Sequence, residues 1–198
     1  MRDGYAEGRA RSPMIRASGV AAMLGGGLWM VGTVLHALEP RGCVGAECAT
    51  RPMRDSSALV AVLAVGAVVL IMVGVAGLVR LARDSGRLGR SGRLGVRVGV
   101  AGLVALLTVG TAQLVLFGGD FRLMPYFVLP GMSAVVVGFL LVGIAIVRAG
   151  VLPRWAGVLL VLGSLALVGA NEQTELVLLM LPFGLAWAAA GYAMTRSN

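Results

Sequence analysis

The chain has 198 residues, of which 58% are hydrophobic and 13% are charged, and its formal net charge is +8. A soluble domain averages about 45–50% apolar and about 25% charged residues, so this composition excludes an ordinary soluble domain. All 17 basic residues are arginines, and their positions beside apolar segments determine what they do.

The first apolar segment covers 17–38 and follows a basic arm over 1–16 that contains four arginines. A helix needs about 20 apolar residues to cross a hydrocarbon core of roughly 30 Å. A secretory signal would have a shorter apolar core of about 7–15 residues and a small-residue cleavage site, and no such site precedes Pro40. We therefore expect an uncleaved transmembrane helix behind a cytoplasmic arm.

The two cysteines of the chain, Cys43 and Cys48, lie in the connection that follows. The four intervening residues include Gly45 and can turn tightly enough to close a disulfide, which an oxidising compartment favours. Free thiols, thiol exchange and metal binding are the alternatives. Membrane thiol oxidases generally use two cysteine pairs, so a single pair argues against that activity.

Two further apolar segments, 57–81 and 94–117, flank an arginine-rich connection. It contains four arginines between Arg83 and Arg93, both included. Each basic residue beside an anionic leaflet contributes about 1 kcal/mol of attraction, so we expect contact with anionic lipid headgroups. A docking site for a cytoplasmic partner is the alternative. Nucleic acid is not expected, because the connection has neither a folded basic surface nor stacking aromatic residues.

The last three segments are 125–147, 153–171 and 175–194. The fifth and sixth are shorter and joined by only a few polar residues, which predicts a helical hairpin. Pro130 and Pro182 lie inside the fourth and sixth segments. Because each proline removes one backbone hydrogen bond, we expect a helix kink at both positions.

The arginines predict the orientation of these six helices. Alternating connections place 13 arginines on the side of the N-terminus and four on the other side. The positive-inside rule then predicts a multi-pass protein of the inner, cytoplasmic membrane with both termini in the cytoplasm. A re-entrant last hairpin would leave this orientation unchanged.

Polar residues gather at the predicted extracytoplasmic ends of the helices. Kinks at the two prolines fall in the same half of the membrane, so these residues could frame an outward-facing cavity. The candidate residues are His36, Glu39, Gln113, Asp120, Asn171, Glu172 and Glu175.

Glu172 is the most informative residue of this set. The uninterrupted apolar part of the fifth segment has only 16 residues, about 24 Å of helix against a core of roughly 30 Å. The carboxylate could therefore lie at or below the interface, where ionisable groups are often functional; a solvated turn is the alternative. His36 and the carboxylates could be drawn as a metal site. One histidine without ligand spacing is not specific, so we expect no metal and no cofactor.

Local similarities recur along the chain. Val-Gly-Thr occurs at 31–33 and 109–111, and Leu-Pro occurs at 129–130 and 181–182. These matches are consistent with three related helical hairpins, and chance in an apolar sequence is the alternative. Closely spaced glycines favour tight helix packing in lipid, within the chain or between copies in a homo-oligomer.

Three segments carry a resemblance to known proteins. They are Arg-Gly-Cys-Val-Gly-Ala-Glu-Cys (41–48), Gly-Gly-Asp-Phe-Arg-Leu-Met-Pro (118–125) and Arg-Ala-Gly-Val-Leu-Pro-Arg-Trp (148–155). These segments resemble small bacterial multi-pass integral membrane proteins of unknown function. The resemblance implies a topology of this kind over most of the chain and brings no activity, cofactor or residue role with it.

The expected fold is all-α: one transmembrane domain over 1–198 that forms a polytopic bundle of about six helices. No serine–histidine–aspartate arrangement, nucleotide loop or paired-histidine motif is present, so no catalytic residue is expected. We expect an accessory or interaction protein, or a binder of lipid or of a small apolar ligand. A small transporter- or channel-like protein is the alternative, although no charge lies clearly at the bilayer midplane. An outer-leaflet enzyme that uses thiols or a metal is the third reading.

Overall fold

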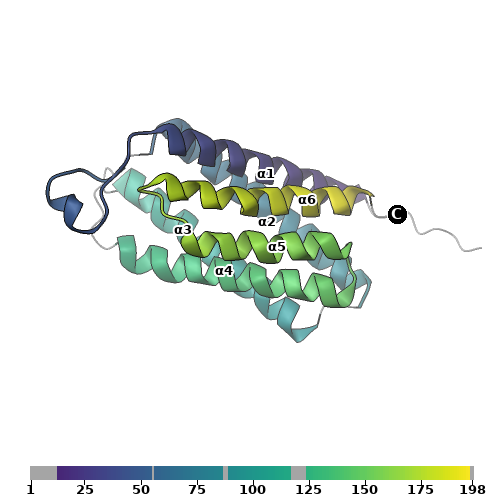
Figure 1. Ribbon diagram of the computed structural model, residues 1–198. Coiled ribbons are helices and arrows are strands. Elements are labelled where there is room, and N and C mark those ends of the chain that lie inside the picture. The colour runs from purple at the N-terminus through teal and green to yellow at the C-terminus, as the bar shows by residue number, and fades with distance from the viewer. Residues whose placement is uncertain (1–12, 55, 87–88, 117–123, 197–198) are drawn as a thin grey trace, which may run out of the picture.

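The computed structural model describes residues 13–54, 56–86, 89–116 and 124–196. Over these ranges the chain is helical and forms no β-strand, which confirms the all-α bundle (Figure 1). The helices are α1 (Pro13–Leu38), α2 (Ala58–Asp84), α3 (Arg90–Leu116), α4 (Met124–Ala149), α5 (Arg154–Ala166) and α6 (Leu181–Arg196), with the short 3-10 helices η1 (Gly45–Ala49), η2 (Leu167–Gly169) and η3 (Glu175–Met180).

Five stretches of this bundle are long and apolar enough to cross a membrane, as expected of a multi-pass membrane protein. They are Pro13–Leu38, Ala58–Asp84, Arg90–Ala112, Tyr126–Ala149 and Glu175–Arg196. The fifth helix is the short one, with 13 residues in α5 and three more in η2. Its length is about 26 Å, because α-helical residues rise 1.5 Å each and 3-10 residues about 2.0 Å.

Local sequence sets where α2 begins and where α2 and α4 end. The Ser57 hydroxyl accepts a hydrogen bond from the Val60 backbone N–H at 3.4 Å, so Ser57 caps the start of α2. After α2 and α4 the chain reaches Gly86 and Gly150, whose φ angles are +63° and +62°. Glycine adopts this left-handed conformation without a Cβ clash, so both helices stop there.

Consecutive helices pack as three hairpins, α1 with α2, α3 with α4, and α5 with α6. The hairpins are joined by contacts of α6 with α1 and of α5 with α4. In Figure 1, α1, α6, α5 and α4 accordingly lie side by side in front of α2 and α3. The contact between α2 and α3 is much smaller, so these two helices pack against each other only over a small area. The predicted hairpin arrangement is present; a common origin of the hairpins stays a prediction.

Glycines bring α1 and α6 into close contact. A Cβ at Gly19 would lie 2.9 Å from the carbonyl oxygen of Gly191, and a Cβ at Gly26 would collide with that of Gly184. Real Cβ atoms do not approach backbone atoms this closely. These glycines therefore serve packing inside the chain, where small residues allow helices to approach in lipid.

Aromatic residues fill the middle of the bundle. Phe139 of α4 and Phe183 and Trp187 of α6 are all fully buried. The ring of Phe139 lies 5.2 Å from that of Trp187 and 5.7 Å from that of Phe183. The Trp187 indole meets the Phe139 ring at 87°, an edge-to-face contact, and its N–H has no hydrogen-bond acceptor. The centre of the protein is thus an apolar core.

The last two helices differ from the sequence prediction. The fifth was expected over 153–171, but its α-helical part ends at Ala166. The sixth was expected as one helix over 175–194, but it begins with the 3-10 helix η3. Pro182 therefore lies in the first turn of α6, where its missing N–H costs no helical hydrogen bond. Pro130, by contrast, lies inside α4 as expected.

Candidate functional site

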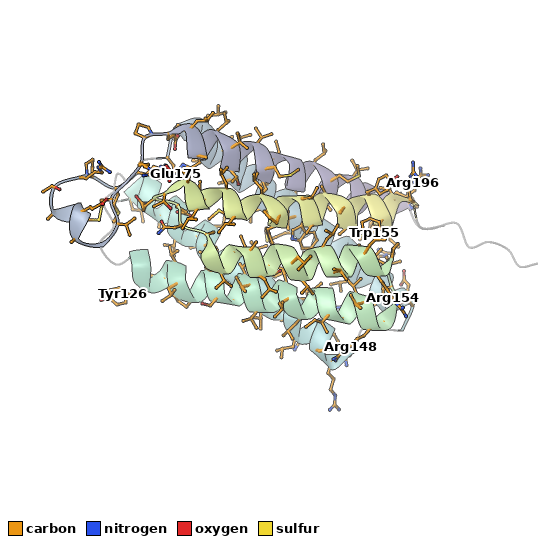
Figure 2. The ribbon with its side chains drawn as sticks, in the orientation of Figure 1. Tyr126, Arg148, Arg154, Trp155, Glu175 and Arg196 are labelled. Atoms are coloured by element: carbon orange, nitrogen blue, oxygen red, sulfur yellow. A yellow bond between two sulfur atoms is a disulfide. The ribbon has the colours of Figure 1, made fainter. Side chains whose placement is uncertain are left out.

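The bundle has two chemically different ends. The end that contains the connection 39–57 and the turn 170–175 is called the disulfide end below. Arg148, Arg154 and Arg196 lie at the opposite end, away from Glu175 (Figure 2). That opposite end, which also holds the connection between α2 and α3, is called the arginine end. Five of the seven candidate residues lie at the disulfide end. The Gln113 side chain and Asp120 lie outside the described residues.

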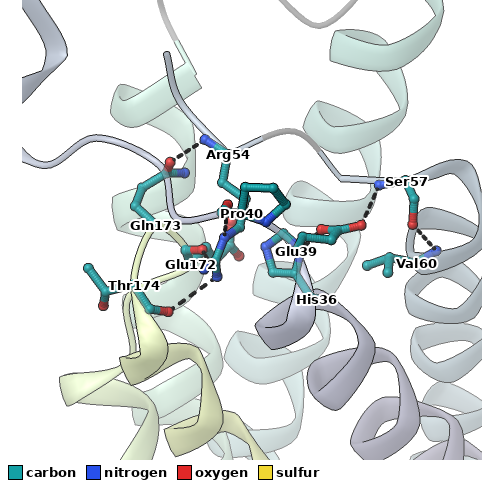
Figure 3. A network of polar contacts seen from close by, with 9 residues as sticks. All are labelled: His36, Glu39, Pro40, Arg54, Ser57, Val60, Glu172, Gln173 and Thr174. Carbon is teal, nitrogen blue, oxygen red and sulfur yellow. Dashed lines mark hydrogen bonds and ion pairs between the residues drawn. The ribbon is translucent and has the colours of Figure 1, made fainter. Parts of the chain in front are cut away.

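His36 and Glu39 form a pair at the end of α1 (Figure 3). The Nδ1 atom of His36, a buried side chain, lies 2.5 Å from Oε2 of Glu39. The other carboxylate oxygen accepts the backbone N–H of Ser57 at 2.9 Å. Burial raises the pKa of Glu39, but the hydrogen bonds from Ser57 and His36 outweigh it and hold this pKa below its ordinary value. The ionised carboxylate therefore ties the end of α1 to the start of α2.

Arg54 is the residue of this end that the sequence did not single out. Its side chain is buried, with 8% exposed, and its guanidinium donates to backbone carbonyls. Nε donates to Pro40 at 2.9 Å, and Nη1 donates to Glu172 at 3.0 Å and to Thr174 at 3.3 Å (Figure 3). The Arg54 backbone N–H also donates to Oε1 of Gln173 at 2.7 Å. Arg54 thus joins the α1–α2 connection to the turn before α6.

The expected disulfide between Cys43 and Cys48 is present, with an S–S distance of 2.00 Å. The backbone N–H of Cys43 donates to the carbonyl of Pro52 at 3.1 Å, so the connection folds back on itself. Next to it, Gly42 donates to the carbonyl of Gln173 at 3.0 Å. A Cβ at Gly42 would collide with the Gln173 side chain. The disulfide therefore closes a loop that is pressed against the turn before α6.

The remaining candidates belong to that turn. Glu175 forms a bidentate ion pair with the exposed side chain of Arg41. Asn171 accepts the backbone N–H of Gln173 through Oδ1 at 2.9 Å, which closes the turn locally. The Glu172 side chain is exposed, and only its carbonyl takes part in the contacts of this end. This arrangement corresponds to a solvated turn, which was the alternative to a Glu172 carboxylate at or below the membrane interface.

Apart from the exposed Glu172 side chain, these polar groups bond to one another or to the backbone of this end. Within the described residues, no group of three or more His, Cys, Asp or Glu side chains is placed to hold a metal ion. The contacts at this end link three chain segments: the end of α1, the disulfide loop and the turn before η3. Their role is therefore structural, because they cross-link the connections between the helices.

The arginine end has a hollow of about 420 Å³ between α2 and α3. Val79, Ala82 and Arg83 of α2 line it together with Gly86 of the turn after α2 and with Arg93, Val96 and Arg97 of α3. Arg80, one turn from Arg83, instead donates to the sulfur of Met14 in α1. Arg196 lies over the ring of Tyr192 at 4.7 Å. The sequence predicted a basic connection here but not a pocket, because the pocket depends on how α2 and α3 diverge.

Comparison with known proteins adds no identification. No protein-family model matches the chain, and neither a curated protein nor a solved structure matches it. The resemblance to small bacterial membrane proteins stays a prediction.

Proposed function

We propose that this protein is a non-enzymatic membrane protein that binds membrane lipid, with its arginine end in the cytoplasm. The observation that carries this proposal is a contrast between the two ends of the bundle. Most polar side chains of the disulfide end are engaged in contacts with neighbouring side chains or backbone, whereas three arginines at the other end line a hollow and form no ion pair within the described residues. The groups left available to a ligand are therefore arginine guanidinium groups beside apolar side chains, a combination that suits lipid.

The filled centre of the bundle argues against transport. A transporter binds its solute or coupling ion near the bilayer midplane, between half-helices or beside an ionisable residue. Here the middle of the bundle is filled by Phe139, Phe183 and Trp187, all fully buried. The buried polar side chains of the described helices are Ser18, Thr33, His36 and Ser164, and only His36, at the end of α1, is ionisable. A lipid binder or accessory protein fits this interior better.

The orientation rests on charge and on redox chemistry. Thirteen arginines on one side against four on the other favour the arginine end for the cytoplasm. A disulfide at the opposite end fits an oxidising compartment outside the inner membrane. Fusion of a fluorescent protein, which folds in the cytoplasm, to the C-terminus tests the orientation; we expect fluorescence. A periplasmic phosphatase that is active at this position would contradict the orientation.

Lipid retention tests the function itself. The full chain is purified in a mild detergent, and co-purifying lipid is counted by native mass spectrometry and by extraction. We expect about one or a few lipids per chain to survive washing that strips lipid from a control membrane protein. A preparation that retains no lipid but carries a stoichiometric second protein would replace the proposal with the accessory-subunit function.

A further inference from the structure

The hollow at the arginine end is built from matching faces of two helices. Val79, Ala82 and Arg83 follow each other at spacings of three and one residues, so they share one face of α2, and Gly86 lines the hollow from the turn after this helix. Arg93, Val96 and Arg97 share one face of α3 in the same way. Two helix faces that together contribute three guanidinium groups thus meet around one space. Its volume of about 420 Å³ lies within the range of roughly 300–1,000 Å³ typical of ligand sites.

None of the three arginines has an anionic partner among the residues that the structure describes. The ion pairs among the described residues are His36 with Glu39, Arg41 with Glu175 and Arg51 with Glu47, all at the disulfide end. Asp84 follows Arg83 directly, but its carboxylate is exposed and forms none of these pairs. In the described part of the chain, three positive charges therefore line the hollow without a counter-charge.

The position of Arg97 makes this excess of positive charge energetically unfavourable. It lies seven residues into α3, about 10 Å of helix from Arg90, in the stretch Arg90–Ala112 that is apolar enough to cross a membrane. Its side chain is exposed, and arginines within such a stretch pair with a partner, reach toward the interface or mark a binding site, because an unpaired charge in lipid is unfavourable. An anion in the hollow would provide that partner.

The chemistry of the lining selects phosphate. Guanidinium groups bind phosphate oxygens through paired, charge-assisted hydrogen bonds. Val79, Ala82 and Val96 add apolar surface beside the three guanidinium groups. A ligand that carries a phosphate next to an apolar portion satisfies both parts of this lining, and phospholipids have this composition.

The face of α3 that lines the hollow continues toward the other end of the bundle. Val100, Val104 and Leu107 follow Arg93 and Arg97 at helical spacing. Val104 has 46% of its surface exposed, whereas Val100 and Leu107 are partly buried against the core. From Arg97 to Leu107 this apolar strip is about 15 Å long, roughly half of a 30 Å hydrocarbon core. One leaflet makes up half of that core, so an acyl chain within one leaflet extends over about the length of the strip.

We propose that this pocket binds the phosphate of an anionic phospholipid through Arg83, Arg93 and Arg97, with an acyl chain along the exposed face of α3. This assignment rests on the proposed lipid-binding function and gives it a site and a headgroup class. A free phosphate ester from the cytoplasm shares the phosphate chemistry but not the need for the apolar strip. The lipid is therefore the source to which the structure points.

The test compares matched arginine variants. Delipidated protein in detergent is titrated with phosphatidylglycerol or with phosphatidylcholine, and bound lipid is counted by native mass spectrometry. The double variant Arg93→Gln with Arg97→Gln removes two charges from the pocket. Its matched control is Arg80→Gln with Arg148→Gln, because Arg80 contacts Met14 and neither residue lines the hollow. Unfolding temperatures of all variants establish that each is folded.

We expect the wild type and the control variant to prefer phosphatidylglycerol over phosphatidylcholine, and the pocket variant to bind phosphatidylglycerol about 25-fold more weakly. That factor corresponds to about fivefold for each arginine that faces an anionic headgroup. Equal weakening in the pocket and control variants would overturn the pocket while leaving lipid binding intact. Absence of binding by either lipid to the wild type would overturn the proposed function as well. Binding of glycerol 1-phosphate to the wild type as tightly as phosphatidylglycerol would assign the pocket to free phosphate esters instead.

If the double variant does not fold, Arg83→Gln alone provides the same comparison, because it removes one pocket charge from an exposed side chain. Its control is then Arg80→Gln. About fivefold weaker binding of phosphatidylglycerol to Arg83→Gln than to Arg80→Gln supports the pocket, and equal binding overturns it.

Discussion

The guanidinium of Arg54 donates to the backbone carbonyl of Glu172 at 3.0 Å, a contact between residues 118 positions apart in the sequence. It joins the connection after α1 to the turn before α6, across the two hairpins that also pack through their glycines. A buried arginine whose hydrogen-bond acceptors among the described residues are all backbone carbonyl oxygens is a fixed structural cross-link. Arg54 would lose most of its hydrogen bonds if the connection after α1 and the turn before α6 moved apart.

Removal of this arginine should destabilise the protein more than removal of its neighbour. Arg54→Ala deletes hydrogen bonds to three carbonyls, and a hydrogen bond to a charged group contributes about 1.5–3 kcal/mol. Because these contacts act together, we expect a loss of about 2–4 kcal/mol in the free energy of unfolding. The measurement is denaturant or thermal unfolding of the purified protein in detergent.

Arg51→Ala is the matched control for that experiment. Arg51 is exposed and lies 3.9 Å from Glu47, a surface ion pair of the kind that contributes about 0–1 kcal/mol. The control should therefore unfold almost as the wild type does. Equal destabilisation by both variants would show that Arg54 is not a cross-link.

The sequence predicted the membrane helices well because their signal is local. The apolar ranges 17–38, 57–81, 94–117 and 125–147 each begin and end within about one turn of the observed helices. Length and hydrophobicity alone decide such segments. The boundary between η3 and α6 was not predictable in this way, because Leu176 to Met180 are as apolar as the residues that follow.

The disulfide end was predictable only in part, for a physical reason. His36 and Glu39 are one helical turn apart, so their contact follows from spacing, and the disulfide follows from the short separation of Cys43 and Cys48. Arg54 bonds to residues more than a hundred positions away, and nothing in its own segment distinguishes it from Arg51. The pairing of Arg41 with Glu175 is hidden for the same reason.

Stability should fall with acidification because of Glu39. Hydrogen bonds from Ser57 and His36 hold the pKa of Glu39 in the folded protein below its ordinary value of 4.5. A lowered pKa in the folded state means that the unfolded chain binds the proton more readily. The contribution of Glu39 is therefore fully present above about pH 4.5 and is lost as the pH falls through its folded pKa.

The Glu39→Gln variant isolates this effect. It should be less stable than the wild type at pH 7, and the difference should shrink as the pH is lowered below 4.5. Unfolding midpoints at pH 7, 5 and 3.5 measure it. Glu47→Gln is the control, because Glu47 is exposed and pairs only weakly. A difference between Glu39→Gln and the wild type that stays constant with pH would contradict the assignment.

Reduction of the disulfide should loosen the disulfide end and leave the arginine end unchanged. The bond closes a loop of about six residues, for which chain entropy predicts a stabilisation of about 2 kcal/mol. We expect the variant Cys43→Ser with Cys48→Ser to lose about this much free energy of unfolding and to retain phosphatidylglycerol binding. Thiol titration of the denatured wild type, with and without reductant, verifies the bond. Loss of lipid binding in this variant would show that the two ends are coupled.

Two adjacent glycines of α1 should respond in opposite ways to alanine. A Cβ at Gly26 would collide with the carbonyl oxygen of Gly184 and would lie 2.6 Å from the backbone nitrogen of Ala188, so the α1–α6 interface must open. A Cβ at Gly27 meets no atom within 4 Å. Alanine is favoured over glycine inside a helix by about 1 kcal/mol. Gly27→Ala should therefore leave stability unchanged or raise it by up to about 1 kcal/mol.

Gly26→Ala should lower the free energy of unfolding by about 1–3 kcal/mol, the usual cost of overpacking. The comparison is informative because both variants add the same methyl group to neighbouring positions of one helix. Thermal unfolding in detergent ranks them, and cross-linking of purified protein reports any change of oligomeric state. If Gly27→Ala were the more damaging variant, the face of α1 that contains Gly27 would be the one that packs, against a second copy of the chain rather than against α6.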